Sequence, residues 1–201
     1  MKKTFLLSCL MLAAMPVMAA YTGHVYVDKN KNGVFDQSEK PLAGIKVSDG
    51  LNVVETAADG SFTLPGHERE RFIFITTPSG YKTFNRHYHK IEKKQSGYDF
   101  GLIPYSGRIR KDGSHRYIHI TDTEIFNTEN HADWVNNVHD YARNEQAAFI
   151  IHTGDLCYEK GLKAHIKLMN TENMDCPVFY CIGNHDLVKG KYGEELFESI
   201  Y

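Results

Sequence analysis

The segment Ala147-Ala148-Phe149-Ile150-Ile151-His152-Thr153-Gly154-Asp155 predicts the fold of the second half of this chain. Its first seven residues are almost continuously apolar, which is typical of a strand buried on both faces of a parallel sheet. Gly154 permits a sharp turn after the strand, and Asp155 then presents a carboxylate at the edge of the sheet. The segment therefore predicts a buried parallel strand that ends in an acidic side chain.

Two further strand-like runs, residues 116–121 and 178–182, also end in polar turns. Residues 130–144 and 162–169 have apolar residues at helical spacing, and residues 194–201 begin another helix. Strands that alternate with helices predict a parallel sheet with right-handed crossovers. The carboxyl ends of such strands meet at one edge, where open α/β sheets bind ligands.

The turns at that edge read Thr121-Asp122-Thr123-Glu124, Gly154-Asp155-Leu156 and Gly183-Asn184-His185-Asp186. Their carboxylate and amide oxygens are hard ligands that suit divalent cations. Residues 115–201 resemble the calcineurin-like metallophosphoesterase family, whose signature is Asp-x-His, then Gly-Asp, then Gly-Asn-His followed by Asp or Glu. The second and third turns match the last two blocks in order and spacing.

The resemblance implies an α/β/β/α domain that holds two divalent metal ions of the Mn, Fe or Zn type, with their identity left open. It assigns one metal to Asp122, both metals to Asp155 as a bridge, and the second metal to Asn184. It also implies that His185 contacts the phosphate and protonates the leaving oxygen, with Asp186 orienting the imidazole. Such a pair of cations polarises phosphoryl oxygens and provides hydroxide near neutral pH.

Two departures from the family pattern are visible. Glu124 stands where the family has histidine, so it is either a substitute ligand or a lost one. The family takes further metal-binding histidines from later strands, which would lie beyond Tyr201. We therefore expect residues 107–201 to form the N-terminal half of the phosphoesterase domain, and the site to need a missing C-terminal half or a partner chain.

The first half of the chain predicts an all-β domain over residues 21–106. Short alternating strands are separated by turns such as Asp49-Gly50 and Asp59-Gly60, a pattern typical of a β-sandwich. This region resembles the N-terminal β-sandwich domain that precedes the catalytic domain in some secreted bacterial calcineurin-like phosphoesterases. The whole chain is thus predicted to be a β-sandwich followed by a partial α/β domain.

Residues 28–39 fit the twelve-residue calcium-loop pattern throughout. Gly33 occupies the position of the sharp turn. No helices flank the loop, so a structural calcium ion is expected rather than a helical calcium sensor; the alternative is a polar loop rich in turn formers. The predicted ligands are the side chains or backbone carbonyl of Asp28, Asn30, Asn32, Val34, Asp36 and Glu39.

The N-terminus reads as a secretory signal peptide over residues 1–20, with two lysines, an apolar stretch and small residues at its end. It predicts a secreted or periplasmic protein, and no segment is long enough to span a membrane. The formal net charge of −2 gives no reason to expect nucleic acid as a partner. Cys157 and Cys181 end neighbouring strands, so a disulfide and free buried thiols both remain open, with free thiols preferred.

These observations predict metal-dependent hydrolysis of phosphate mono- or diesters, acting on a small-molecule phosphoester. The rival hypothesis is a non-catalytic, calcium-stabilised surface module that carries an inactive phosphoesterase half-domain. Downstream strands that end in histidines would distinguish the first hypothesis from the second.

Overall fold

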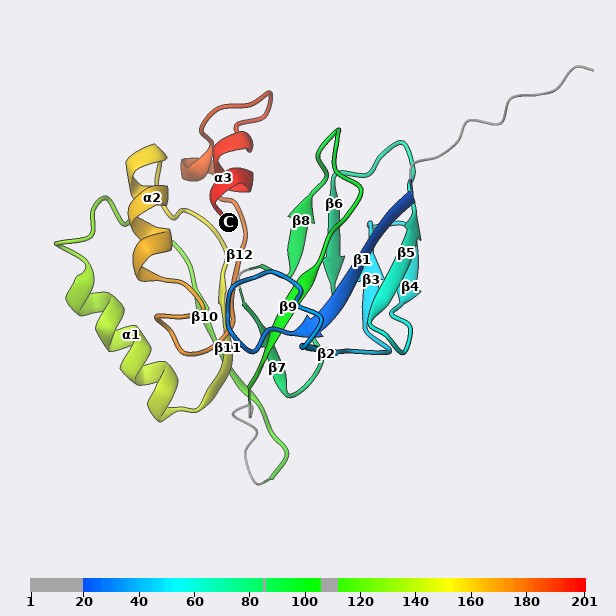
Figure 1. Cartoon of the computed structure of the whole chain (residues 1–201). Coiled ribbons are helices and arrows are strands. Elements are labelled where there is room, and N and C mark those ends of the chain that lie inside the picture. The colour runs from blue at the N-terminus through cyan, green and yellow to red at the C-terminus, as the bar shows by residue number, and fades with distance from the viewer. Residues whose placement is uncertain (1–19, 85, 106–111) are drawn as a thin grey trace, which may run out of the picture.

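The computed structural model describes residues 20–84, 86–105 and 112–201. Two regions of different architecture lie side by side, a β-rich N-terminal module and an α/β C-terminal region (Figure 1). The predicted signal peptide, apart from Ala20, and the predicted domain boundary after residue 106 lie outside the described residues. In the part of the chain that the structure describes, no helix is long and apolar enough to cross a lipid bilayer.

The N-terminal module is built from nine strands in two sheets. One sheet has the order β2-β1-β9-β7, with β5 also paired to β1, and the other has the order β4-β3-β6-β8. The strands are β1 Ala20–Val27, β2 Lys40–Pro41, β3 Lys46–Ser48, β4 Val53–Glu55, β5 Ser61–Pro65, β6 Phe72–Ile75, β7 Tyr81–Thr83, β8 Tyr88–Lys90 and β9 Phe100–Pro104.

Strand β1 holds this module together because it pairs differently along its length. Residues 20–24 pair antiparallel with β5, whereas residues 25–27 pair in parallel with β9, and Tyr26 and Val27 pair antiparallel with β2. Alternate side chains of the strands point inward, and they form one core that includes Val25, Leu64 and Phe100. The β-rich fold expected from the sequence is confirmed, while the sandwich itself stays a prediction.

The C-terminal region alternates strands and helices, as predicted. Its three strands are parallel in the order β10-β11-β12, so the buried run at residues 147–152 is central. The elements are β10 Arg116–Ile120, α1 Ala132–Asn144, β11 Ala147–His152, α2 Glu159–Leu168, β12 Val178–Tyr180, the 3-10 turn η1 Asn184–Asp186 and α3 Glu195–Ile200.

Helices α1 and α2 cover the face of the parallel sheet that points away from the N-terminal module (Figure 1). Val135 of α1, Ile150 of β11 and Ala164 of α2 belong to the core beneath them. Trp134 and Tyr141, which also have helical spacing, are 40% and 60% exposed. They lie seven residues apart on one side of α1, about 100° away from the stripe that contains Val135.

The opposite face of the parallel sheet meets the N-terminal module. Phe179 of β12 packs edge-on against His87, with ring centroids 5.4 Å apart. On α3, Glu198 accepts hydrogen bonds from Arg71 at 2.5 Å and from Lys90 at 2.7 Å, and Arg86 donates to the last backbone carbonyls of that helix. Cationic groups at a helix C-terminus are favourable because they oppose the negative end of its dipole.

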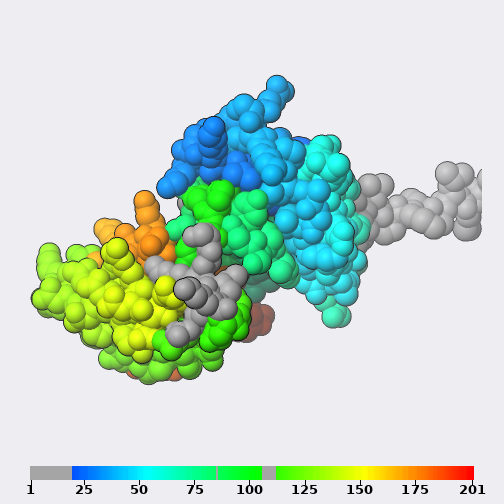
Figure 2. Space-filling model, turned by 90° about the horizontal axis from the view of Figure 1, so that it is seen from below, coloured from blue at the N-terminus to red at the C-terminus, as the bar shows by residue number. Residues whose placement is uncertain are grey.

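A cleft of about 1030 Å³ lies between the two regions. Side chains of both regions line it, among them Arg86, Tyr88, Phe197 and Tyr201. Figure 2 shows the two regions as separate lobes that touch across this boundary. The ion pairs there join the exposed side chains of Arg71 and Lys90 to the partly buried Glu198.

No disulfide joins the cysteines of the described residues. Cys157 and Cys176 are buried, as expected of small apolar thiols, whereas Cys181 is exposed. Strand β12 ends at Tyr180, so Cys181 lies just beyond it on an edge that no further strand covers in the described structure.

Two buried histidines lie between β11 and α2. The rings of His152 and His165 are both fully buried and are 5.0 Å apart. Burial lowers the pKa of His165 to about 3 and that of His152 to about 4, because the protonated ring would lose its hydration. Nδ1 of His165 lies 3.0 Å from the hydroxyl of Tyr201, which ties α2 to the end of α3.

We expect acid to destabilise this region through His165. Well above pH 6.5 the His165 ring is neutral in both the folded and the unfolded chain. Below pH 6.5 the unfolded chain binds a proton on this ring, whereas the folded chain does not bind it until the pH approaches 3, so the unfolding free energy falls as the pH falls. His165→Gln should therefore reduce the pH dependence of the unfolding free energy by about 1.4 kcal/mol per pH unit between pH 6 and 4. Urea denaturation at several pH values measures this slope. His115→Gln, at an exposed histidine, is the control, and an equal slope in both variants would contradict the prediction.

Candidate metal centre

The loops that follow β10 and β11 are joined by backbone hydrogen bonds beyond the ends of the strands. The N–H groups of Asp122 and Glu124 donate to the carbonyls of Gly154 and Asp155, at 3.1 and 3.2 Å. The N–H of Ile125 donates to the carbonyl of the residue after Asp155, at 2.9 Å. The first two predicted metal-binding turns therefore lie against each other along their backbones.

The loop after β12 is attached to the same place through two carboxylates. Asp186 is fully buried, and its two oxygens accept the N–H groups of Cys157 at 2.7 Å and Gly183 at 2.9 Å. Oδ1 of Asp155 accepts the N–H of His185 at 3.0 Å. Charge-assisted hydrogen bonds of this kind are about twice as strong as neutral ones. All three predicted turns are thus brought together at one edge of the sheet.

The backbone of these loops is strained in the way that functional sites often are. Asp122, Glu124 and Asp155 have φ values of 53°, 45° and 56°, in the left-handed region that L-residues seldom adopt. Each such residue costs on the order of 1 kcal/mol or more and persists only where its surroundings hold it. Three of them coincide with predicted ligand positions.

The glycines of the second and third turns are required by close backbone approach. A Cβ on Gly183 would lie 2.2 Å from the backbone nitrogen of Asp155 and 2.3 Å from its Oδ1. A Cβ on Gly154 would lie 2.7 Å from the Cα of Gly183, and Gly154 also has a φ of 108°. The sequence predicted sharp turns here; the packing of one glycine turn on the other appears only in the structure.

The imidazole of His185 is positioned by two residues that the sequence did not predict for this role. Its Nδ1 lies 3.1 Å from Oε1 of Glu124, and its ring stacks on that of Tyr158 with centroids 5.7 Å apart and planes 14° apart. Asp186, which the resemblance expects to orient the imidazole, accepts backbone N–H groups of the loops with both carboxylate oxygens. Glu124 is the carboxylate that lies against the imidazole.

His152 supports the loops from beneath. Its Nδ1 accepts the N–H of Gly154 at 3.2 Å, so in the neutral ring Nε2 carries the proton and donates it to Oγ1 of Thr123 at 3.0 Å. One buried imidazole thus connects the first two turns. Its place within an apolar strand was the only sequence signal for this role, and such a residue resembles an ordinary core histidine.

The donor groups at this edge fit divalent metal ions. Asp155 uses one carboxylate oxygen for His185, and Glu124 likewise uses only Oε1, which leaves a second oxygen on each. Asp122 and Asn184 are exposed, and no cationic side chain within the described residues pairs with Asp122 or Asp155. Carboxylate and amide oxygens without a positive partner are suitable ligands for hard cations.

The residues of the predicted calcium loop lie elsewhere, in the N-terminal module between β1 and β2. Asp28 and Glu39 are buried, Asp36 is partly buried, and the loop closes on itself through the bond from the N–H of Glu39 to the carbonyl of Asp36. The six predicted calcium ligands and the six predicted phosphoesterase residues therefore form two separate groups.

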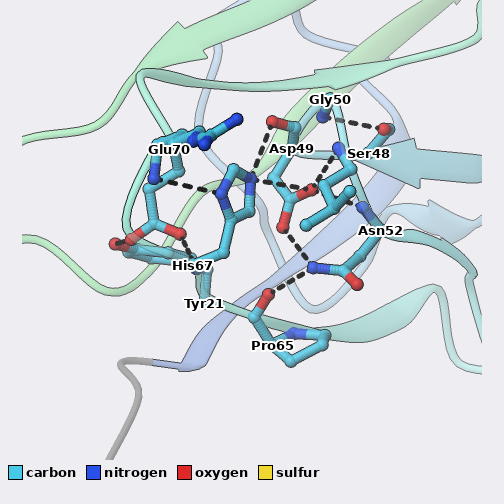
Figure 3. A network of polar contacts seen from close by, with 10 residues as sticks. Tyr21, Ser48, Asp49, Gly50, Asn52, Pro65, His67 and Glu70 are labelled. Atoms are coloured by element: carbon cyan, nitrogen blue, oxygen red, sulfur yellow. Dashed lines mark hydrogen bonds and ion pairs between the residues drawn. The ribbon is translucent and has the colours of Figure 1, made fainter.

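A third group of potential ligands was not predicted from the sequence. One ligand atom from each of Asp49, His67 and Glu70 lies within 4.8 Å of the others, and among the described residues no other trio of histidine, cysteine or acidic side chains does so. At least one pair of ligand atoms among Asp122, Glu124 and Asp155 is therefore farther apart than this limit. Figure 3 shows the Asp–His–Glu cluster in the loops that follow β3 and β5.

Hydrogen bonds within the module already use the atoms of this cluster. Nδ1 of His67 accepts the N–H of Arg69 at 3.1 Å, and Glu70 accepts from the hydroxyl of Tyr21 and the N–H of His67 (Figure 3). Burial raises the pKa of Asp49, but hydrogen bonds from Asn52 and Leu51 outweigh it and hold that pKa below its usual value. The contacts show a network that joins two turns.

Comparison with protein families agrees with the two-part architecture. The model described as the N terminal of calcineurin-like phosphoesterase matches residues 29–104, and the model described as calcineurin-like phosphoesterase matches residues 115–200. The chain belongs to the calcineurin-like phosphoesterases. A search among curated proteins returns no match. Membership of this family indicates metal-dependent phosphoester hydrolysis and does not favour a purely structural surface module.

The calcineurin-like phosphoesterase should not tolerate a side chain at Gly183. Gly183→Ala should destabilise the α/β region by about 1–3 kcal/mol, because the new Cβ meets the backbone and carboxylate of Asp155. Gly97→Ala is the control, since its Cβ would meet nothing within 4 Å, and it should change stability by less than about 0.5 kcal/mol. Denaturant unfolding measures both, and equal stability of the two variants would refute the packing argument.

Proposed function

We propose that this chain hydrolyses phosphate mono- or diesters at a centre of two divalent metal ions. The observation that carries the proposal is the convergence of three strand-end turns, which backbone hydrogen bonds and the Asp186 carboxylate hold together. That arrangement gathers oxygen donors from three separate segments at one sheet edge. A phosphoester of a small molecule is the substrate class that the family supports.

The residues of the three turns divide the binding task. Asp122 and Glu124 would supply oxygens from the first turn, Asp155 from the second and Asn184 from the third. Support for a central role of Asp155 is that its segment is hydrogen-bonded to both of the other turns. Bound divalent metals would supply charge stabilisation and an activated water. The left-handed backbone at Asp122, Glu124 and Asp155 fixes the directions of these donors.

His185 is the residue placed to transfer a proton. When the imidazole is protonated, Nδ1–H donates to Oε1 of Glu124, and the second proton is held on Nε2. Stacking on Tyr158 fixes the ring plane. Nε2 can then deliver its proton to the oxygen that leaves phosphorus, which lowers the barrier for a poor alkoxide leaving group.

The remaining proposals concern the setting of this activity. We propose export to the periplasm or beyond, because the first twenty residues have the pattern of a signal peptide. We also propose that the two N-terminal sheets form a β-sandwich and that the C-terminal region belongs to an α/β/β/α catalytic domain. The near-neutral charge gives no electrostatic reason for nucleic acid to be the substrate.

Asp155→Asn should abolish activity. We expect the wild-type chain, supplied with Mn²⁺, to hydrolyse a generic aryl phosphate or its diester, and this variant to lose at least about 100-fold in kcat/KM because the bridging charge is removed. Asp140→Asn, at an exposed aspartate of α1, is the matched control and should retain wild-type activity.

Circular dichroism of both variants separates loss of chemistry from loss of fold. Absence of metal-dependent turnover by the wild-type chain, or equal activity of Asp155→Asn and Asp140→Asn, contradicts the proposal.

A further inference from the structure

The loop over residues 28–39 is organised around two buried carboxylates. Asp28, at the end of β1, is 1% exposed, and Glu39, just before β2, is 7% exposed. The oxygens of Asp28 accept the N–H groups of Asn32 and Gly33 at 3.2 and 2.9 Å, and those of Glu39 accept the N–H groups of Lys29 and Asp36 at 2.9 and 3.1 Å. The first and last positions of the loop are thus drawn inward.

Within the described parts of the chain, no cationic side chain forms an ion pair with the carboxylates of this loop. Asp28, Asp36 and Glu39 take part in no ion pair among the residues that the structure describes, and Lys29 and Lys31 within the loop are exposed. Backbone N–H groups satisfy part of the hydrogen-bonding capacity but leave the net charge. Burying carboxylates in this way is costly unless a cation pairs with them.

A buried hydroxyl beside Asp28 gives an independent indication of a ligand. Tyr26 is fully buried, and its hydroxyl has no hydrogen-bond partner among the residues that the structure describes. A Cβ built on Gly101 would lie 3.2 Å from that hydroxyl and 3.0 Å from Oδ2 of Asp28, so these groups are neighbours. An unpartnered buried hydroxyl is rare in native proteins and needs an explanation.

The other positions of the loop present oxygens at the spacing that a calcium ion requires. Counting Asp28 as position 1, oxygen donors fall at positions 3, 5, 7, 9 and 12, and Gly33 at position 6 has a φ of 71°. Oδ2 of Asp36 accepts the amide groups of Asn30 and Asn32 at 2.8 and 3.3 Å, which places these three side chains together.

We propose that residues 28–39 bind one Ca²⁺ through the side chains of Asp28, Asn30, Asn32, Asp36 and Glu39 and the carbonyl of Val34, with the Tyr26 hydroxyl bonded in the layer behind them. The ion would balance the buried carboxylates and join the end of β1 to the start of β2. The N–H of Asp28 donates to the carbonyl of Leu102 at 2.9 Å, so β9 is joined to the same site. This site is independent of the proposed phosphoesterase centre.

The position of the loop gives the ion a structural role in the whole chain. The loop lies at the surface of the module, as the blue segment in Figure 2 shows. Gly33 also lines the cleft between the two regions, together with Gly101. An ion held here would fix one wall of that cleft, and it would do so without any residue of the metal centre described above.

Terbium luminescence tests the site directly. Tb³⁺ replaces Ca²⁺ at oxygen-rich sites, and its emission is excited through a nearby tyrosine, which Tyr26 supplies. We expect saturable emission from the full chain that Ca²⁺ displaces with an apparent dissociation constant on the order of 10⁻⁴–10⁻³ M, the range of extracellular calcium modules. Saturating Ca²⁺ should also raise Tm by roughly 5 °C.

Two variants weaken Ca²⁺ binding at different ligand positions. Glu39→Gln and Asp36→Asn each replace a carboxylate with an amide that keeps an oxygen acceptor, and each should weaken Ca²⁺ binding at least about tenfold. Asp36 is only partly buried, so its variant remains informative if Glu39→Gln fails to fold. Asp59→Asn is the control, because Asp59 makes a similar turn with Ser61 on the surface and should bind as the wild type does.

Asp155→Asn distinguishes this site from the phosphoesterase centre. Emission that survives in Asp155→Asn and disappears in Asp36→Asn supports the proposal, whether or not the chain hydrolyses phosphoesters. Emission that depends on Asp155, emission unchanged in Asp36→Asn, or no saturable displacement by Ca²⁺ would overturn it.

Discussion

The arrangement of this protein's C-terminal region depends on the backbone hydrogen bonds that continue past the ends of β10 and β11. The bonds from Asp122 and Glu124 to Gly154 and Asp155 hold two loops side by side where regular strand geometry has already ended. The Asp186 carboxylate then attaches the third loop. Without these contacts the left-handed residues would relax and the oxygen donors would separate, because strained backbone persists only where its surroundings hold it.

The two halves of the chain hold groups of acidic side chains close together in different ways. In the C-terminal region, backbone N–H groups and a buried imidazole orient the acidic turns, and the oxygens that we propose as ligands remain accessible. In the N-terminal loop, the carboxylates of Asp28 and Glu39 are themselves buried. An exposed set of oxygens suits a centre that exchanges substrate, whereas a buried set suits an ion that stays in place.

Much of the architecture could be predicted because its signals are local. The apolar run at residues 147–152 and the helical periods on either side predicted a parallel sheet, and the structure confirms it. The glycine turns likewise marked the ends of β11 and β12. Short strands such as β2 and β7 were not predicted, since two or three residues carry too little pattern to separate a strand from a loop.

What the sequence by itself determined is the order of elements, the identity of the oxygen donors and the glycines that permit sharp turns, because periodicity and backbone freedom are properties of short segments. Only the tertiary structure decided that Glu124 lies against Nδ1 of His185 and that Tyr158 stacks on the same ring. These pairs are joined by packing between separate loops and strands. Contacts of that kind depend on distances across the fold, which no local pattern encodes.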